Sequence, residues 1–379
     1  MPDPTILITA GEPSGDRLGG ALMEQLKKLH PNVVFIGVGG PEMIGQGLKS
    51  TFPMSDLSVM GLVEVIPAIP RIKKRLLELT ELARGTKPTL VITIDSQDFS
   101  TRLATKLKPL GIPHIHYVAP KVWAWRQHRV FKLKTLYTYL LTILPFEEEF
   151  FGQAGIPTTY VGHPAVTTLA PYTLKPSTPQ PLNPVLALLP GSRRAELTRH
   201  WPLFLQTYRS LRQVIPNLTA TLALPDEKAL HTCQSLSPWT LQDAITPVFG
   251  ESRFAALATA TAALSKSGTN NLELALLGTP AVVTYRMNRL SHFLARYLIK
   301  VPFISLPNLI LHYAGQKPVY PELIQHAATL QSLSAALTPL LLGQPAAHIQ
   351  RQALATFHKL MSTPKPPAQQ AAQVISKYI

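Results

Sequence analysis

Two short turns in the second half of the chain carry residues suited to holding an anion. One lies in Leu188-Leu189-Pro190-Gly191-Ser192-Arg193-Arg194 and the other in Ser265-Lys266-Ser267-Gly268-Thr269. Each closes an apolar strand and opens a predicted helix, so backbone N–H groups and the positive end of a helix dipole face one point. Arg193 adds a guanidinium that can bind two phosphate oxygens at once. Together the turns predict a diphosphate-bearing ligand, and a glycosyl nucleotide fits.

Eight residues in this half are predicted to bind the nucleotide. Glu273, in the first turn of the second helix, could accept hydrogen bonds from ribose hydroxyls or could simply complement the helix dipole. Asn308 is expected on an irregular loop, where asparagine is usually a turn residue. The predicted set is Gly191, Ser192, Arg193, Ser267, Gly268, Thr269, Glu273 and Asn308.

Acidic residues follow two predicted strands in the first half of the chain. Gly11-Glu12-Pro13-Ser14-Gly15-Asp16 comes after the strand at 5–10 and lacks the G-x-G-x-x-G spacing of dinucleotide-binding turns. Ser14 or Asp16 could cap the next helix. Glu12, at the mouth of a strand end, is equally open to a structural and a catalytic role.

Asp95-Ser96-Gln97-Asp98 directly follows an apolar strand at 90–94. A carboxylate there is placed to act as a general base. The structural alternative is a helix N-cap, which Ser96 or Asp98 could provide. We therefore predict Asp95 as the catalytic base, with Glu12 and Asp98 near it.

Apolar strands alternate with helical patterns along the whole chain, which predicts parallel βαβ units. Strands are expected at 5–10, 33–38, 90–94, 115–118, 140–144, 184–189, 219–224, 262–264 and 281–285. The fold class is therefore α/β, with two doubly wound Rossmann-like domains facing a cleft. The predicted parts are an N-terminal domain at 1–168, a proline-rich linker at 169–183, a C-terminal domain at 184–340 and a helical tail at 341–379.

Composition restricts the partners of this chain. With 46% hydrophobic and 15% charged residues among 379, it is not a disordered chain. Its formal charge of +15 favours an anionic partner, and its one cysteine excludes a disulfide framework. Since Asp-x-Asp and His-x-x-x-His patterns are absent, no metal or other cofactor is expected.

Residues 60–79 predict a basic amphipathic helix. Pro67 and Pro70 should delay its start to about Ala68, because proline is tolerated only in a first turn. The apolar stripe could pack on its own sheet or contact a membrane interface. The predicted membrane or acyl contacts are Leu62, Val63, Ile66, Ile69, Ile72 and Leu76. No stretch is long enough to span a bilayer.

The cluster Trp123-Ala124-Trp125-Arg126 mixes aromatic and basic residues, as nucleic-acid-binding surfaces do. It stands alone, because the other basic residues are dispersed. We therefore expect packing at the edge of a cleft and no nucleic acid.

Taken in order, these strings resemble the lipid-A-disaccharide synthase family of GT-B glycosyltransferases. The matching segments are Gly11–Asp16, Val59–Val65, Asp95–Phe99, Val122–Arg126, Pro145–Glu147, Gly162-His163, Leu188–Arg193, Ser267–Glu273, Tyr285-Arg286 and Ser305–Asn308. They run from near residue 5 to near residue 325.

The resemblance implies transfer of a diacylated glucosamine from UDP to the 6-hydroxyl of diacylglucosamine 1-phosphate. The products would be a β-1,6 disaccharide and UDP. It implies that Asp95 takes the acceptor's proton, that Arg193 and the Ser267–Thr269 turn stabilise the departing UDP, and that residues around 63–76 dock on the inner membrane. The expected location is cytoplasmic and peripheral on that anionic membrane. The resemblance leaves open whether the protein forms a homodimer.

The chain also departs from the family pattern. Lys266, Asn270 and Asn271 stand where small apolar residues are usual, Leu311-His312-Tyr313 resembles an insertion, and Gln316 replaces an arginine. Two other functions fit the residues: another UDP-sugar glycosyltransferase or epimerase on the same scaffold, or a basic peripheral membrane protein without turnover.

Overall fold

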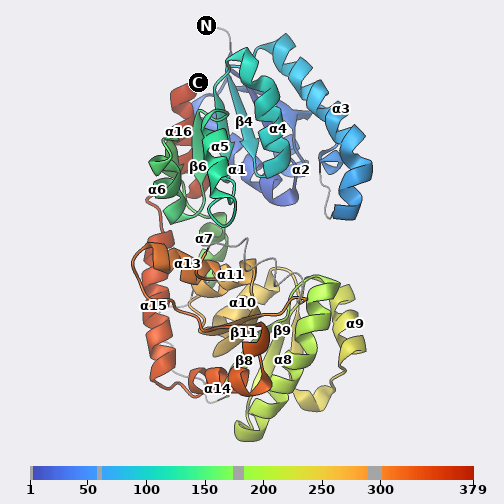
Figure 1. The fold of residues 1–379 in the computed structure, drawn as a ribbon, viewed down its shortest axis with the longest axis vertical. Coiled ribbons are helices and arrows are strands. Elements are labelled where there is room, and N and C mark those ends of the chain that lie inside the picture. Colours follow the sequence, from blue (N-terminus) through green and yellow to red (C-terminus); the bar gives the residue numbers. More distant parts are fainter. Residues whose placement is uncertain (1–2, 58–61, 174–182, 289–300) are drawn as a thin grey trace. The chain divides into compact units, whose positions relative to one another are not determined.

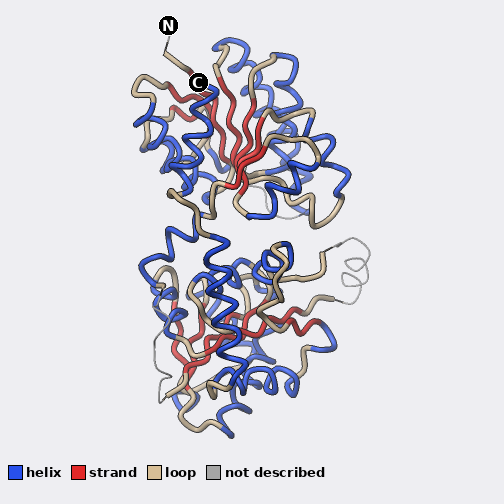
Figure 2. The backbone as a smooth tube through the Cα atoms, turned by 90° about the vertical axis from the view of Figure 1, so that its left-hand side faces the viewer, coloured by secondary structure: helices blue, strands red, loops and turns tan. Residues whose placement is uncertain are grey.

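A computed structural model describes residues 3–57, 62–173, 183–288 and 301–379 of the chain. They form two compact units (Figures 1 and 2). The first unit comprises Met1–Pro164 together with Thr363–Ile379, and the second comprises Ala165–Ser362. Each is built on one parallel sheet, which bears out the predicted pair of Rossmann-like domains.

The first unit contains a seven-stranded parallel sheet in the order β3-β2-β1-β4-β5-β6-β7. Its strands are β1 (Thr5–Ala10), β2 (Val34–Val38), β3 (Lys49–Ser50), β4 (Leu90–Ile94), β5 (His114–Tyr117), β6 (Tyr139–Thr142) and β7 (Thr158–Tyr160). Its helices are α1 (Pro13–Leu29), α2 (Pro41–Gly45), α3 (Leu62–Thr86), α4 (Gln97–Leu107), α5 (Val130–Lys134), α6 (Pro145–Gln153) and α16 (Pro367–Ile375).

Both faces of this sheet are buried, as the side chains of β1 illustrate. Ile6 and Ile8 pack in one cluster with residues of α1 and α16. Leu7, on the opposite face, packs with residues of α3 and α4. Since successive strand residues point to opposite faces, a strand covered on both sides must be apolar throughout. This explains why the central strands were recognisable in the sequence.

The second unit contains a six-stranded parallel sheet in the order β10-β9-β8-β11-β12-β13. Its strands are β8 (Val185–Leu189), β9 (Thr219–Ala223), β10 (Ile245–Val248), β11 (Ala262–Lys266), β12 (Ala281–Tyr285) and β13 (Glu322–Ile324). Its helices are α7 (Pro164–Leu169), α8 (Arg194–Val214), α9 (Glu227–Leu236), α10 (Ser252–Thr259), α11 (Thr269–Leu276), α13 (Leu306–Tyr313), α14 (Leu330–Leu341) and α15 (Pro345–Met361).

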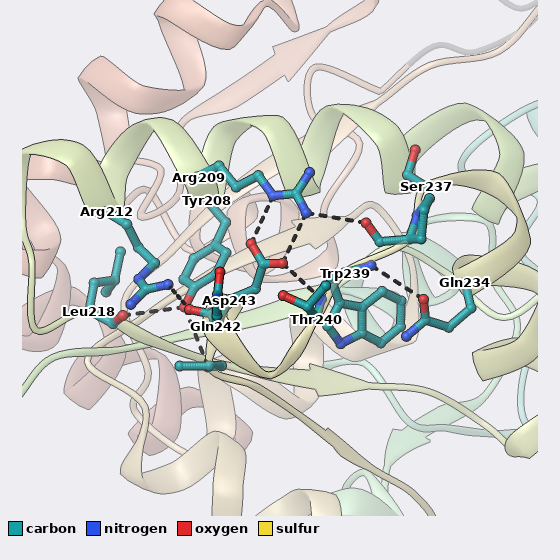
Figure 3. Close-up of polar contacts among 12 residues, drawn as sticks. Tyr208, Arg209, Arg212, Leu218, Gln234, Ser237, Trp239, Thr240, Gln242 and Asp243 are labelled. Atoms are coloured by element: carbon teal, nitrogen blue, oxygen red, sulfur yellow. Dashed lines mark hydrogen bonds and ion pairs between the residues drawn. The ribbon is translucent and has the colours of Figure 1, made fainter.

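Helix α8 is fixed to the segment that precedes β10 by a group of polar contacts (Figure 3). The guanidinium of Arg209 donates to both oxygens of Asp243, at 2.8 and 2.9 Å. These bonds lower the pKa of the Asp243 carboxyl. The Tyr208 hydroxyl donates to the Asp243 carbonyl on the same segment. An otherwise exposed connection is thereby tied to the sheet's covering helix.

The sequence missed four strands, and each lies at an edge of its sheet. They are β3, β7, β10 and β13, two to four residues long. None of their residues is buried. An edge strand is defined by the backbone of its neighbour, so a short one carries little hydrophobic signal of its own.

The boundaries between the units differ from those predicted. The chain enters the second unit at Ala165, ahead of the proline-rich segment. The cause is packing: the Tyr172 ring lies 5.7 Å from the ring of Phe254 on α10. Residues 174–182 of the predicted linker lie outside the described residues. The tail returns to the first unit only from Thr363, because α15 packs on α11, α13 and α14.

Helix α3 begins at Leu62, so the predicted start near Ala68 was wrong. Pro67 and Pro70 lie inside the helix, although a proline there removes a backbone N–H and crowds the preceding turn. The side chains of Leu62, Val63 and Ile66 lie outside the described residues. In the described parts of the chain, no helix combines the length and the apolar character needed to span a bilayer.

The apolar stripe of α3 divides between core and surface. Leu76 is buried in the core with residues of α4, and Ile72 packs against that cluster. Leu76 is therefore covered by the protein itself, whereas Ile72 is only half-buried and its predicted membrane contact stays a prediction. Ile69 is 39% exposed and Leu77 is 54% exposed. Core packing therefore accounts for the inner part of the stripe only.

Asp16 caps a helix, but not α1, the helix for which the sequence predicted a cap at Ser14 or Asp16. It lies within α1, whose N-cap is Glu12 and has no side-chain capping bond, so neither Ser14 nor Asp16 caps α1. The Asp16 carboxylate instead accepts from the N–H groups of Gly40, Glu42 and Met43 at 2.8–3.1 Å. It therefore caps α2 across the sheet edge.

Replacing Asp16 with alanine should destabilise the first unit. Three N–H groups would lose their acceptor, and we expect a cost of about 2–4 kcal/mol. The thermal midpoint and the hydrogen exchange of amides 40–45 measure it. Glu24→Ala on the exposed side of α1 is the matched control. Equal effects of the two substitutions would contradict the capping role.

Candidate active site

The strand order of the first sheet brings Glu12 and Asp95 to one place. β1 and β4 are adjacent and parallel, and the order of strands reverses between them. In open α/β sheets, ligands bind at such a reversal, outside the carboxyl ends of the strands. Glu12 follows β1 and Asp95 follows β4. The two acids that the sequence singled out therefore share the edge where a substrate is expected.

The main chain of Asp95 is held in an uncommon conformation. Asp95 and Ser96 have φ values of 50° and 43°, in the left-handed region that non-glycine residues rarely adopt. The Asp95 N–H donates to the Tyr117 carbonyl at 2.9 Å, and the Ser100 hydroxyl donates to the Asp95 carbonyl at 2.8 Å. Strained backbone that is fixed at both ends is typical of functional positions.

Glu12 and Asp95 influence each other electrostatically. Burial of Glu12, followed by the nearby negative charge of Asp95, raises the pKa of the Glu12 carboxyl. Close packing also explains Gly11, since a Cβ there would lie 2.4 Å from the Ser96 hydroxyl. The turns that follow β1 and β4 are thus packed closely against each other.

Asp98 and Ser96 have other surroundings. Asp98 is exposed in the first turn of α4, where its charge complements the helix dipole. Ser96 occupies the N-cap position, but its side chain makes no capping bond. Of the three predicted catalytic residues, Glu12 and Asp95 follow adjacent strands, whereas Asp98 lies on the exposed side of α4.

The second unit contains a pocket of about 240 Å³ at the corresponding strand ends. It is lined by residues that follow β8, β9 and β11, and by Arg253 of α10. The strand order reverses between β8 and β11. Gly191 and Ser192 of the first predicted turn line it, as do Gly268 and Thr269 of the second. The sequence did not identify Arg253, which lies about sixty residues from the first turn.

The first turn does not offer its N–H groups as predicted. Glu196, one turn into α8, accepts from the Ser192 N–H at 3.1 Å and from the Arg193 N–H at 3.4 Å through Oε2. The protein's own carboxylate therefore occupies the place expected for phosphate. Gly191 has φ 122°, and a Cβ there would lie 2.6 Å from the same oxygen. The side chain of Arg193 is exposed at the N-cap of α8.

The second turn has the predicted strand–turn–helix form. Gly268 is the N-cap residue of α11, and Thr269 is its first residue. The Ser267 hydroxyl donates to the Ile304 carbonyl at 2.8 Å, so it holds a neighbouring segment. Asn270 also lines the pocket.

Glu273 forms an ion pair with Arg253, at 2.8 Å. Its Oε1 atom accepts from the guanidinium, while Oε2 is buried and has no hydrogen-bond partner among the described residues. Burial raises the pKa of Glu273 against the opposing effect of Arg253. Among the described residues Glu273 is not part of the pocket lining, and it meets the pocket through Arg253, which it binds.

Asn308 lies in helix α13, so the predicted irregular loop was wrong. It is fully buried. Its amide oxygen accepts from the N–H groups of Val319 and Tyr320, and its amide nitrogen donates to Tyr320 O and to Glu322. This amide is saturated by the protein, and its role is to fix the chain after α13.

The aromatic cluster of the first unit is mainly a packing element. Trp123 is 3% exposed, and its indole N–H donates to Glu147 Oε1 at 2.9 Å. The Glu147 Oε2 atom accepts from the Leu144 N–H, at the start of α6. Burial raises the pKa of Glu147 to about 7, against the opposing hydrogen bond from Trp123. The predicted packing is confirmed for Trp123, whereas Trp125 is 41% exposed under the Arg126 guanidinium.

Glu147 should make the stability of the first unit depend on pH near neutrality. A carboxyl whose folded pKa is raised stabilises the protein below its ordinary pKa of 4.5, and that contribution is lost as pH rises through about 7. Glu147→Gln cannot titrate, and any lost hydrogen bond costs the same at every pH. The thermal midpoint of the variant, relative to that of the wild type, should therefore rise as the pH increases from 5 to 8. A constant difference would contradict the assignment.

Comparisons with known proteins agree with the fold and the motifs. The model of the lipid-A-disaccharide synthetase family matches residues 6–375. The lipid-A-disaccharide synthase of Granulibacter bethesdensis is 40% identical over 366 residues, 93% of this chain and 92% of the relative.

Solved structures with the same fold include a putative UDP-N-acetylglucosamine 2-epimerase of Listeria monocytogenes. Its TM-score is 0.60 at 12% identity, covering 99% of this chain and 95% of that chain. The calicheamicin glycosyltransferase has a TM-score of 0.61 at 15% identity, covering 100% and 98%. These likenesses concern the fold alone. The sequence match over nearly its whole length shows that the chain belongs to the lipid-A-disaccharide synthase family.

Proposed function

We propose that the protein is an inverting glycosyltransferase of lipid A biosynthesis. It joins UDP-2,3-diacylglucosamine to 2,3-diacylglucosamine 1-phosphate, giving the β-1,6 disaccharide and UDP. The observation that carries this proposal is the family match over residues 6–375. The two strand-order reversals support it, since they supply an acidic edge in the first unit and a cationic pocket in the second.

The acceptor is assigned to the first unit, with Asp95 as the general base. The 6-hydroxyl oxygen attacks the anomeric carbon of the donor while its proton passes to the Asp95 carboxylate. The bond between that carbon and the diphosphate oxygen breaks, and its electron pair leaves with UDP. This direct displacement inverts the anomeric configuration and uses neither a covalent intermediate nor a metal ion.

The choice between the two acids follows from the electrostatics of the pair. A general base must be ionised to accept a proton, and the raised pKa of Glu12 disfavours its ionised form. Asp95 is also the residue whose main chain is fixed in the strained turn. Glu12 then acts beside it, by hydrogen bonding the acceptor hydroxyls.

The donor is assigned to the pocket of the second unit. Its UDP would lie against the turn at Gly268 and Thr269, where helix α11 begins. The exposed side chain of Arg193 can reach the diphosphate from the start of α8. Glu273 acts there through Arg253, which it binds at the pocket.

Asp95→Asn should abolish transfer while leaving UDP binding intact. Asparagine keeps the left-handed turn but cannot take a proton, and loss of a general base costs about 10²–10⁴ in rate. Disaccharide formation is followed by mass spectrometry with the two purified acylated substrates, and UDP affinity by calorimetry.

Glu81→Gln makes the same change of charge at an exposed ion pair and serves as the control. An Asp95→Asn enzyme as active as this control would remove Asp95 from the mechanism. A wild-type protein that binds UDP but makes no disaccharide would overturn the proposed reaction itself.

We also propose that α3 contacts the anionic membrane in which the acylated substrates lie. Its exposed side chains include Ile69, Arg71, Lys73, Lys74 and Leu77. Arg75 does not belong to this surface, because it is bound to Asp56 and Glu78 and lies over the ring of Phe52. Exposed cations beside apolar side chains suit an interfacial helix.

Changing Arg71, Lys73 and Lys74 together to glutamine should weaken binding to phosphatidylglycerol vesicles by about tenfold or more, since each cation near an anionic surface contributes about 1 kcal/mol. Sedimentation with vesicles measures it. The control changes Arg102, Lys106 and Lys108 to glutamine, which removes the same charge from α4 and its C-cap residue. If the two triple variants bind alike, α3 is not the contact.

A further inference from the structure

Among the described residues, the lining of the pocket in the second unit includes two cations and no carboxylate. Arg253 and Lys266 line it, whereas their ion-pair partners Glu273 and Glu196 do not. Each cation is thus held by an acid that is not part of the lining. An anion entering the pocket meets positive groups first, even though the charges of the four side chains cancel.

Three donors of the protein itself take up most of the roughly four acceptor positions of the Glu196 carboxylate. Its Oε2 atom accepts from two backbone N–H groups, and its Oε1 atom accepts from Lys266 Nζ at 2.9 Å. Although burial acts against it, the bonds from Lys266 and the Ser192 N–H lower the pKa of Glu196. The carboxylate is therefore ionised at neutral pH, and its charge is shared among three donors.

Lys266 lies directly beside the second turn. A Cβ built on Gly268 would be 3.2 Å from Lys266 Nζ, so the ammonium lies over the residue that precedes α11. An ammonium has three N–H groups, and the described structure uses one of them, for Glu196. Glu196 already offsets the charge of this ammonium, and its two remaining N–H groups, next to the positive end of the α11 dipole, suit a further anion.

We propose that Lys266 binds the diphosphate of the nucleotide donor and that Glu196 is the residue that positions it. The proposal rests on the proposed function, in which this pocket takes the UDP-sugar. It moves the phosphate contact from the N–H groups of the first turn, which Glu196 occupies, to the second turn.

The test compares ligands with and without phosphates. Lys266→Met keeps the aliphatic stem and removes the charge. We expect UDP affinity, measured by calorimetry, to fall about tenfold or more, as for the loss of a charge-assisted hydrogen bond. The affinity for uridine, measured by ligand-observed NMR, should not change, and Lys266→Arg should restore most of the UDP affinity. Lys359→Met, at an exposed position of α15, is the matched control.

Glu196→Gln tests the positioning role. It leaves Lys266 charged but removes the anion that holds it, so UDP affinity should fall by a smaller factor than in Lys266→Met, again with uridine unaffected. The double variant Lys266→Met/Glu196→Gln leaves no unpaired charge at the turn. It keeps the experiment informative if a single variant loses thermal stability, and it should match Lys266→Met in UDP affinity.

Two results would overturn the inference. In one, Lys266→Met binds UDP as tightly as the Lys359→Met control. In the other, UDP and uridine affinity fall together, which means that the ion pair only braces the two turns. The disaccharide assay on the wild type is read separately. If the wild type binds UDP but forms no disaccharide, the proposed reaction is wrong. The UDP and uridine affinities of the variants then still decide whether Lys266 binds the diphosphate.

Discussion

Each sheet reverses its strand order once, between β1 and β4 in the first unit and between β8 and β11 in the second. At a reversal, the connections that leave two adjacent parallel strands turn toward opposite sides. The space above those strand ends is left open, and side chains that follow the strands can meet there. Glu12 and Asp95 meet in this way in the first unit, and the Gly191 and Gly268 turns do so in the second. The candidate active site depends on these reversals of strand order, because its residues are far apart in the sequence.

Several carboxylates near helix starts hold the protein's own backbone. Asp16 caps α2, Glu147 binds the start of α6, and Glu196 binds the turn before α8. In each case the acceptor is a side chain rather than a ligand, although the same N–H groups would suit an anion. These hydrogen bonds from the backbone to acidic side chains fix the loops that follow the strands. It also leaves the cations Arg253 and Lys266 facing the pocket, since the acids that balance them lie outside its lining.

Asn308 and Lys266 illustrate the limits of motif reading in opposite directions. Asn308 stands in a segment that resembles the family pattern, yet its amide is saturated by Val319, Tyr320 and Glu322. Lys266 departs from that pattern, yet it lines the pocket beside α11. A motif records which residue types recur, whereas the hydrogen-bond partners of a side chain depend on segments elsewhere in the chain.

The sequence alone determined the central strands, because strands covered on both faces must be apolar throughout, and it identified the turns where Asp95 and Gly268 lie. Only the tertiary structure decided the edge strands, the course of α3 through its two prolines and the division of its apolar stripe between core and surface. It also decided that Glu196 fills the first turn and that Arg253 joins the pocket. The physical reason is the sequence separation of the interacting residues. Hydrophobic periodicity is a local property that can be read along the chain. Ion pairs and the pairing of edge strands join segments that are far apart in the sequence, and the sequence does not show which segments these are.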